Sequence, residues 1–197
     1  CMWSDFFEMK KQIEDKIKNN EKVSPPFLLT TMYDSPKIQF ECAKVWQNEY
    51  KLKYKQNLSF SFKKKTSKKI KLGFFSADFR LHAMGHLMVG MLERHDKSQF
   101  ELYGFYFGPK IKSGDTLHKR IFNCFDKFID VSLMSDFEVL NFCRELEIDI
   151  AIDFMCHTGD YNRFNLFLKR LAPIQINFLG YPGTSGSNSL DYIIADK

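Results

Sequence analysis

The segment 70-IKLGFFSADFRLHAMGH-86 is the clearest indication of the fold of this chain. Its first seven residues form a short apolar run between polar neighbours, which is typical of a buried strand. A polar loop follows directly, and the pattern predicts a helix over residues 85–94. A strand, a polar loop and a helix in this order indicate one repeat of an α/β fold.

The same alternation continues along the chain. We expect further strands over residues 100–107, 127–131, 148–154, 174–179 and 192–195, and helices over 116–125, 136–146 and 163–170. This spacing predicts a mostly parallel sheet with helices on both faces. Ligands of such sheets bind at the carboxyl ends of the strands, which selects the loops 77–85, 108–115, 155–162 and 180–188.

The first 50 residues have a different character. Apolar residues at helical spacing predict a helix over 5–18, with Ser4 as its cap. The prolines of Ser24-Pro25-Pro26 should break the chain, and Ser35-Pro36 should open a second helix. We therefore expect a helical segment over residues 1–50, ahead of an α/β domain over 69–197.

A basic segment joins these two parts. Nine lysines and no acidic residue lie between Lys51 and Lys71, whereas the rest of the chain has 20 basic and 24 acidic residues. We interpret residues 51–68 as a solvated linker. Contact with an anionic surface or a nucleic acid is the alternative, because Tyr54, Phe60 and Phe62 lie among the lysines.

Composition limits the class of protein. The 197 residues are 44% hydrophobic, enough to bury the core of one domain, and no apolar run is long enough to cross a membrane. The five cysteines show no Cys-x-x-Cys spacing, which favours a reducing, cytoplasmic location over a zinc site or a disulfide framework. Because the chain begins with Cys1, we expect it to be part of a longer protein.

The loop after the first strand carries the first group of candidate residues. Asp78, Arg80, His82 and His86 lie within nine residues. His82 should lie beside a helix N-terminus at the ligand edge, where an imidazole can bind an anion or take a proton. A metal pair formed by His82 and His86 is disfavoured, because no His-Glu-x-x-His order occurs.

Two later loops carry further candidates. Asp153, His157 and Arg163 surround the end of the strand over 148–154, although Asp153 could equally serve only to hold a loop. The loop 179-LGYPGTSG-186 has three glycines, which allow its backbone to approach phosphate or sugar oxygens. No Asp-x-Asp triplet occurs in the chain, which argues that any sugar transfer proceeds without a metal ion.

Taken together, these motifs resemble those of the O-GlcNAc transferase family, which includes the SPINDLY proteins (glycosyltransferase family 41). The resemblance runs through nearly the whole chain. Its motifs are Cys1-Met2-Trp3-Ser4-Asp5, Leu72–Phe79 followed by His82 and His86, Asp153 with His157-Thr158 and Arg163, Leu171–Gln175, Leu179–Gly186 and Asp191-Tyr192. Each motif is modest alone, but their order and spacing are specific.

The resemblance implies a GT-B architecture, of which residues 69–197 would be the N-terminal Rossmann-like lobe, placed after a tetratricopeptide array. It implies inverting, metal-independent transfer of N-acetylglucosamine from UDP-N-acetylglucosamine to Ser or Thr of proteins, with no cofactor. By motif position His82 and Asp78 would be catalytic residues. Leu179 and Gly180 would bind the donor, with Thr184 as a weaker counterpart in the same loop.

Two other functions are compatible with the same residues. Transfer of fucose from a guanosine donor is the SPINDLY activity, and nothing in these residues separates it from transfer of N-acetylglucosamine. A binding or scaffold module without catalysis is the third hypothesis, which the lysine-rich segment favours and the presence of His82 and Asp78 opposes. The partners expected are a nucleotide sugar and protein acceptors, without a membrane or a nucleic acid.

Overall fold

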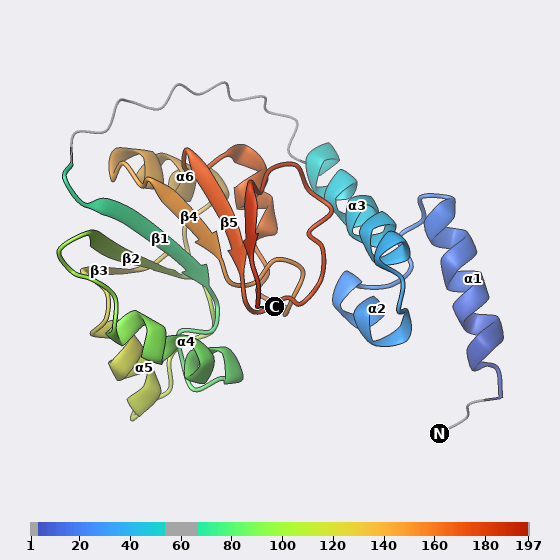
Figure 1. Ribbon diagram of the computed structural model, residues 1–197, viewed down its shortest axis with the longest axis horizontal. Helices are drawn as coiled ribbons and strands as arrows, with labels where there is room; N and C mark the ends of the chain where they lie inside the picture. Colours follow the sequence, from blue (N-terminus) through green and yellow to red (C-terminus); the bar gives the residue numbers. More distant parts are fainter. Residues whose placement is uncertain (1–3, 54–66, 197) are drawn as a thin grey trace. The chain divides into compact units, whose positions relative to one another are not determined.

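The computed structural model describes residues 4–53 and 67–196, which divide into two compact units (Figure 1). The first unit combines residues 4–53 with Tyr181–Asn188. The second combines residues 67–180 with 189–196. The central part of the expected linker, residues 54–66, lies outside the described residues, and so do the aromatic residues that could stack on bases.

The first unit contains three helices, α1 (Phe6–Lys18), α2 (Pro26–Met32) and α3 (Pro36–Lys53). Helices α1 and α3 match the prediction, but α2 does not, because the pair Pro25-Pro26 predicts only a break in the chain. Pro26 instead occupies the first turn of α2, where a missing N–H leaves no hydrogen bond unmade. The expectation that Ser4 caps α1 is also wrong, because the cap position is Asp5 and no side chain caps the helix.

The core of the first unit lies between its helices and includes Ile17, Leu29, Tyr33, Ile38 and Cys42. The segment Tyr181–Asn188 also belongs to this unit. There Gly186 has a φ of 64°, and a Cβ on it would lie 2.6 Å from the Lys44 backbone nitrogen. The side chains of Gln47 and Ser187 form a hydrogen bond of 2.8 Å beside this contact. A glycine at position 186 is therefore required for the segment to approach the backbone of α3.

The second unit is built on a six-stranded sheet. Its strands are β1 (Ile70–Ser76), β2 (Phe100–Tyr106), β3 (Lys127–Asp130), β4 (Ile150–Asp153), β5 (Ile174–Phe178) and β6 (Tyr192–Ile194). They lie in the order β3-β2-β1-β4-β5-β6, and all five pairings are parallel. This is the strand order of a Rossmann-type sheet. The predicted α/β fold with a parallel sheet is thus confirmed.

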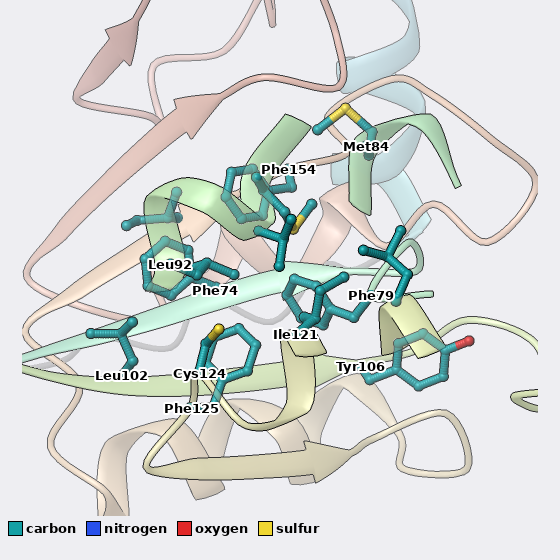
Figure 2. Close-up of a cluster of buried hydrophobic side chains, with 14 residues drawn as sticks. Phe74, Phe79, Met84, Leu92, Leu102, Tyr106, Ile121, Cys124, Phe125 and Phe154 are labelled. Carbon is teal, nitrogen blue, oxygen red and sulfur yellow. The ribbon is translucent and has the colours of Figure 1, made fainter. Parts of the chain in front are cut away.

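Helices cover both faces of this sheet (Figure 1). Helices α4 (Ala83–Glu93) and α5 (Thr116–Phe122) pack on the face to which Phe74 points, in the buried cluster of Figure 2. Phe75 points to the opposite face, where its ring lies 5.3 Å from that of Phe167. That face is covered by the 3₁₀ helix η1 (Phe164–Lys169) and by α6 (Asp136–Glu145). Because side chains alternate between the two faces along β1, neighbouring phenylalanines contribute to the core on both sides of the sheet.

The observed elements differ from the predicted ones mainly at their ends. Residues 163–170 were expected to form an α-helix, but they form the shorter 3₁₀ helix η1. Helix α6 begins as expected after Ser135, which forms a capping box with Glu138. The connection from β5 to β6 contains no helix, and most of it is the segment that belongs to the first unit. Among the described residues, no helix is both long and apolar enough to cross a membrane.

Candidate active site

The strand order identifies where a ligand would bind. The chain leaves β1 toward β2 on one side and leaves β4 toward β5 on the other, although β1 and β4 are neighbours. Such a topological switch point opens a crevice at the carboxyl ends of the two strands. The loops 77–85 and 155–162 follow these ends. Of the four loops selected from the sequence, these two flank the switch point.

Asp78 is a buried carboxylate in the first of these loops. Its backbone N–H donates to the Ser76 hydroxyl at 2.9 Å, which fixes the turn after β1. Oδ1 accepts a hydrogen bond from the Arg80 guanidinium at 3.1 Å, and Oδ2 lies 3.5 Å from Nδ1 of His82. The structure therefore brings together the two residues that the sequence singled out as catalytic candidates.

His82 is the N-cap of α4. Its Nδ1 accepts a hydrogen bond from the Met84 backbone N–H at 3.2 Å, so the neutral ring carries its proton on Nε2. In this state Nε2 can donate a hydrogen bond but cannot accept a proton. To act as a base at Nε2, the ring must instead carry its proton on Nδ1. The Nδ1–H group would then face Asp78, and Nδ1 could no longer accept the hydrogen bond from the Met84 amide. The two neighbours of Nδ1 thus decide which role the ring can take.

The loop between β1 and His82 is tied to the core at its centre. The Phe79 ring is fully buried, and it packs 5.2 Å from the ring of Phe125 and 6.4 Å from that of Phe154 (Figure 2). The Phe79 carbonyl oxygen lies 2.7 Å from Nδ1 of His118 on α5. The loop that carries Asp78 and His82 is therefore anchored to the core and to α5 through Phe79.

Leu179 and Gly180 follow β5 with positive φ angles of 54° and 72°. Gly180 approaches the β4 loop so closely that a Cβ on it would lie 1.9 Å from the Phe154 carbonyl oxygen. Cys156, in the loop after β4, also has a positive φ, of 47°. Leu179 and Cys156 are not glycines, so each holds local backbone strain beside the switch point. Strain of this kind is frequent at functional sites.

Thr184, the remaining donor-binding candidate, belongs to the first unit. Its hydroxyl accepts a hydrogen bond from the Gly186 backbone N–H at 3.2 Å, and its side chain is half-buried. Within its own unit Thr184 therefore shapes the glycine-rich segment. The glycine-rich loop 179–186 is continuous in the sequence, but residues 179–180 belong to the second unit and residues 181–186 to the first.

Asp153 is a second carboxyl group at the switch point. Its Oδ1 accepts hydrogen bonds from the backbone N–H groups of Met155 and Cys156, at 2.8 and 3.0 Å. Its Oδ2 is buried and has no partner among the described residues. Burial raises the pKa of Asp153 to about 6, against the lowering effect of the two amide hydrogen bonds. The residue thus holds the loop through these two hydrogen bonds, as the alternative interpretation expected.

The raised pKa of Asp153 predicts how stability depends on pH. Between the ordinary value of 3.8 and about 6, the folded state keeps a proton that the unfolded chain has lost. Raising the pH through this window should therefore lower the free energy of unfolding, by about 3 kcal/mol in all. Urea unfolding at several pH values should show this loss in the wild type and not in Asp153→Asn. The same slope in both proteins would contradict the assignment.

The other candidates of the two loops have structural partners or lie apart. The Arg163 guanidinium donates hydrogen bonds to the Asp136 carboxylate and to the carbonyl oxygens of Val131 and Met134. It therefore binds the loop before α6 and not the end of β4. The expectation that Asp153, His157 and Arg163 gather there is wrong for Arg163.

His157 is buried with its ring 4.9 Å from that of Phe164. Within residues 4–53 and 67–196, no three His, Cys, Asp or Glu side chains form a metal-binding group.

Sequence reasoning missed the part played by Asp115. This residue is the N-cap of α5, and it also accepts a hydrogen bond from the Leu81 backbone N–H at 2.7 Å. An Asp directly before a predicted helix is a recognisable capping signal. The contact with Leu81 spans 34 positions of the sequence, and no local pattern predicts it.

Comparisons with known proteins agree with the motifs. A UDP-N-acetylglucosamine–peptide N-acetylglucosaminyltransferase of Caenorhabditis elegans is 31% identical over 136 residues, which are 68% of this chain and 12% of the relative. A SPINDLY protein of Oryza sativa subsp. japonica is 25% identical over 160 residues, which are 80% of this chain and 17% of the relative. The chain thus spans less than a fifth of the length of these curated relatives.

A solved structure of a mutant O-GlcNAc transferase from Thermobaculum terrenum superposes with a TM-score of 0.71 at 26% identity. The match covers 83% of this chain and 31% of that one. It confirms the expected fold, one α/β lobe of a GT-B glycosyltransferase. A sequence profile of glycosyl transferase family 41 matches residues 8–197, which is nearly the whole chain, and the chain therefore belongs to that family.

Proposed function

We propose that this chain is part of the catalytic region of a protein O-glycosyltransferase. The whole protein would transfer N-acetylglucosamine from UDP-N-acetylglucosamine to Ser or Thr hydroxyls, with inversion at the sugar carbon. The observation that carries this proposal is the Asp78–His82 pair, which lies at the switch point of the sheet with Oδ2 and Nδ1 3.5 Å apart. The activity belongs to the longer protein, because the chain spans only a small part of its relatives.

The reaction needs a proton path and a stabilised leaving group. An acceptor hydroxyl loses its proton as it attacks the sugar carbon, and the diphosphate leaves with additional charge. In this proposal His82 and Asp78 lie on the proton path, while Leu179, Gly180 and Thr184 contact the donor sugar. His82 enters the reaction either as a donor through Nε2 or, after its proton has moved to Nδ1, as a base.

We further propose that the transfer uses no metal ion and no cofactor. The sequence has no Asp-x-Asp triplet to hold a divalent cation on the diphosphate. The leaving group would then be stabilised by backbone N–H groups, helix N-termini or cationic side chains. His82 is the N-cap of helix α4, so the first amide groups of the helix lie beside the proposed site.

The partners that follow are a nucleotide sugar and proteins with accessible Ser or Thr residues. We assign no nucleic-acid or membrane partner. The proposed location is the cytoplasm, and the state of the cysteines supports it. Cys42, Cys124, Cys143 and Cys156 are buried free thiols, as expected in a reducing compartment.

The choice of donor is the point to test first, since the family resemblance also allows transfer of fucose from GDP-fucose. The full-length protein would be incubated with a protein acceptor and either UDP-N-acetylglucosamine or GDP-fucose, each labelled in the sugar. We expect label from the uridine donor to enter Ser or Thr residues of the acceptor. Label from the guanosine donor alone would replace the proposal by fucose transfer, and label from neither would refute both.

A further inference from the structure

Asp115 connects the beginning of α5 to the loop that carries His82. Its Oδ1 accepts a hydrogen bond from the His118 backbone N–H at 2.8 Å, and its Oδ2 accepts one from the Leu81 backbone N–H at 2.7 Å. One carboxylate therefore holds two amide groups that lie in different elements. We propose that Asp115 is a positioning residue, which sets the place of His82 through Leu81. The kinetic part of this inference rests on the proposed function.

The bond to Leu81 restrains the end of the loop that adjoins His82. The Leu81 side chain is 66% exposed, so packing does little to fix it. Phe79 and its carbonyl oxygen anchor the loop two residues earlier, at the core and at His118. Leu81 directly precedes His82, so the hydrogen bond to Asp115 restrains the peptide from which the imidazole extends.

The contacts of His82 are sensitive to small displacements. Its Nδ1 lies 3.2 Å from the Met84 nitrogen, at the long limit of a hydrogen bond, and 3.5 Å from Oδ2 of Asp78, just beyond that limit. A shift of Leu81 that moves the ring changes both distances and so favours one partner over the other. The position of Leu81 thus influences which ring nitrogen of His82 carries the proton.

Only a carboxylate meets both requirements at position 115. Burial raises the pKa of Asp115, but the hydrogen bonds from the His118 and Leu81 amides and the charge of His118 outweigh burial and lower it. Both oxygens are therefore available as acceptors at neutral pH. A Ser at this position can still cap α5 through its hydroxyl, but its single short oxygen cannot also reach the Leu81 amide. The two roles of Asp115 can therefore be separated.

The first test measures amide hydrogen exchange at single-residue resolution in the full-length protein. In Asp115→Ala and Asp115→Ser we expect exchange at Leu81 to rise at least tenfold. We expect exchange at Met84, whose amide binds His82 rather than Asp115, to rise as well. The α5 amides should be affected in the Ala variant and restored in the Ser variant. If Met84 stays as protected as in the wild type, Asp115 does not position His82, whatever the enzyme does.

The second test is kinetic, with the same two variants and labelled UDP-N-acetylglucosamine. We expect kcat to fall about tenfold or more in both variants, while KM for the donor stays within about twofold. Asp115→Ser should regain thermal stability relative to Asp115→Ala without regaining kcat. Recovery of kcat together with stability would reduce Asp115 to a helix cap and overturn the inference.

Ser135→Ala is the matched control, because it removes the N-cap of α6 without touching the loop 77–82. It should lower thermal stability and leave kcat and the exchange of Met84 unchanged. A fall in kcat equal to that of the Asp115 variants would show that any lost cap has this effect. If the wild type transfers neither sugar, the proposed function fails, while the exchange measurement still decides whether Asp115 positions His82.

Discussion

Replacing His82 by Ala in the full-length protein is expected to lower sugar transfer by about 10²- to 10⁴-fold. The ring lies at the carboxyl end of the sheet, 39% exposed, with Nδ1 between the Met84 amide and the Asp78 carboxylate. An Ala side chain can neither donate nor accept a proton there. Initial rates of label transfer from UDP-N-acetylglucosamine measure the effect.

This variant also removes the N-cap of α4, so a control must separate capping from chemistry. Asn is among the best N-cap residues, and in His82→Asn its side-chain oxygen can accept from the Met84 amide as Nδ1 does. We expect His82→Asn to match the wild type in thermal stability and His82→Ala in activity. If His82→Asn transfers sugar at close to the wild-type rate, the imidazole has only a structural role and the proposed mechanism is wrong.

The second large effect is expected for stability, in Gly180→Ala. The new Cβ would lie 1.9 Å from the Phe154 carbonyl oxygen, and the φ of 72° is itself unfavourable for Ala. The backbone of β5 or of the β4 loop must move to accommodate it. Strain and overpacking together should lower the free energy of unfolding by about 3 kcal/mol or more. Urea unfolding followed by far-ultraviolet circular dichroism is suitable, because it reports on the sheet.

Gly114→Ala separates the two contributions. Gly114 has a similar φ of 83°, but a Cβ on it would meet no atom within 4 Å. Only the conformational penalty then applies, which is about 1 kcal/mol. Equal losses in the two variants would show that Gly180 is needed for its φ angle alone. The larger loss expected at Gly180 would show that the close approach of β5 to the β4 loop is itself a structural requirement.

The elements of the sheet could be predicted from sequence because each strand is a short apolar run. Residues 70–76 match β1 at both ends, and each of the other strands differs from its predicted range by at most three residues, counting both ends. Helix α2 was missed because a pair of prolines indicates a break and an N-terminus equally well. The 3₁₀ form of η1 was missed because six residues carry too little periodicity to separate it from an α-helix.

The candidate site could be predicted only in part, for a different reason. Asp78 and His82 are near neighbours in the sequence, and one loop brings them together. Arg163 was placed wrongly and Asp115 was missed, because their partners, Asp136 and Leu81, are 27 and 34 positions away. The switch point depends on the strand order, which no local pattern contains. Motif order indicated the family, but the contacts of each residue could be read only from the structure.

The inclusion of residues 181–188 in the first unit has a consequence for biosynthesis. The helices α1 to α3 leave the ribosome first, but the segment that packs on the Ala43–Lys44 backbone is made about 125 residues later. At about 5–20 residues per second, this delay is roughly 6 to 25 s. During that time the nascent helices lack their last native contacts and are open to chaperones or to mispairing. The helices α1 to α3 are therefore made early, but they gain their last native contacts only after most of this chain has been synthesised.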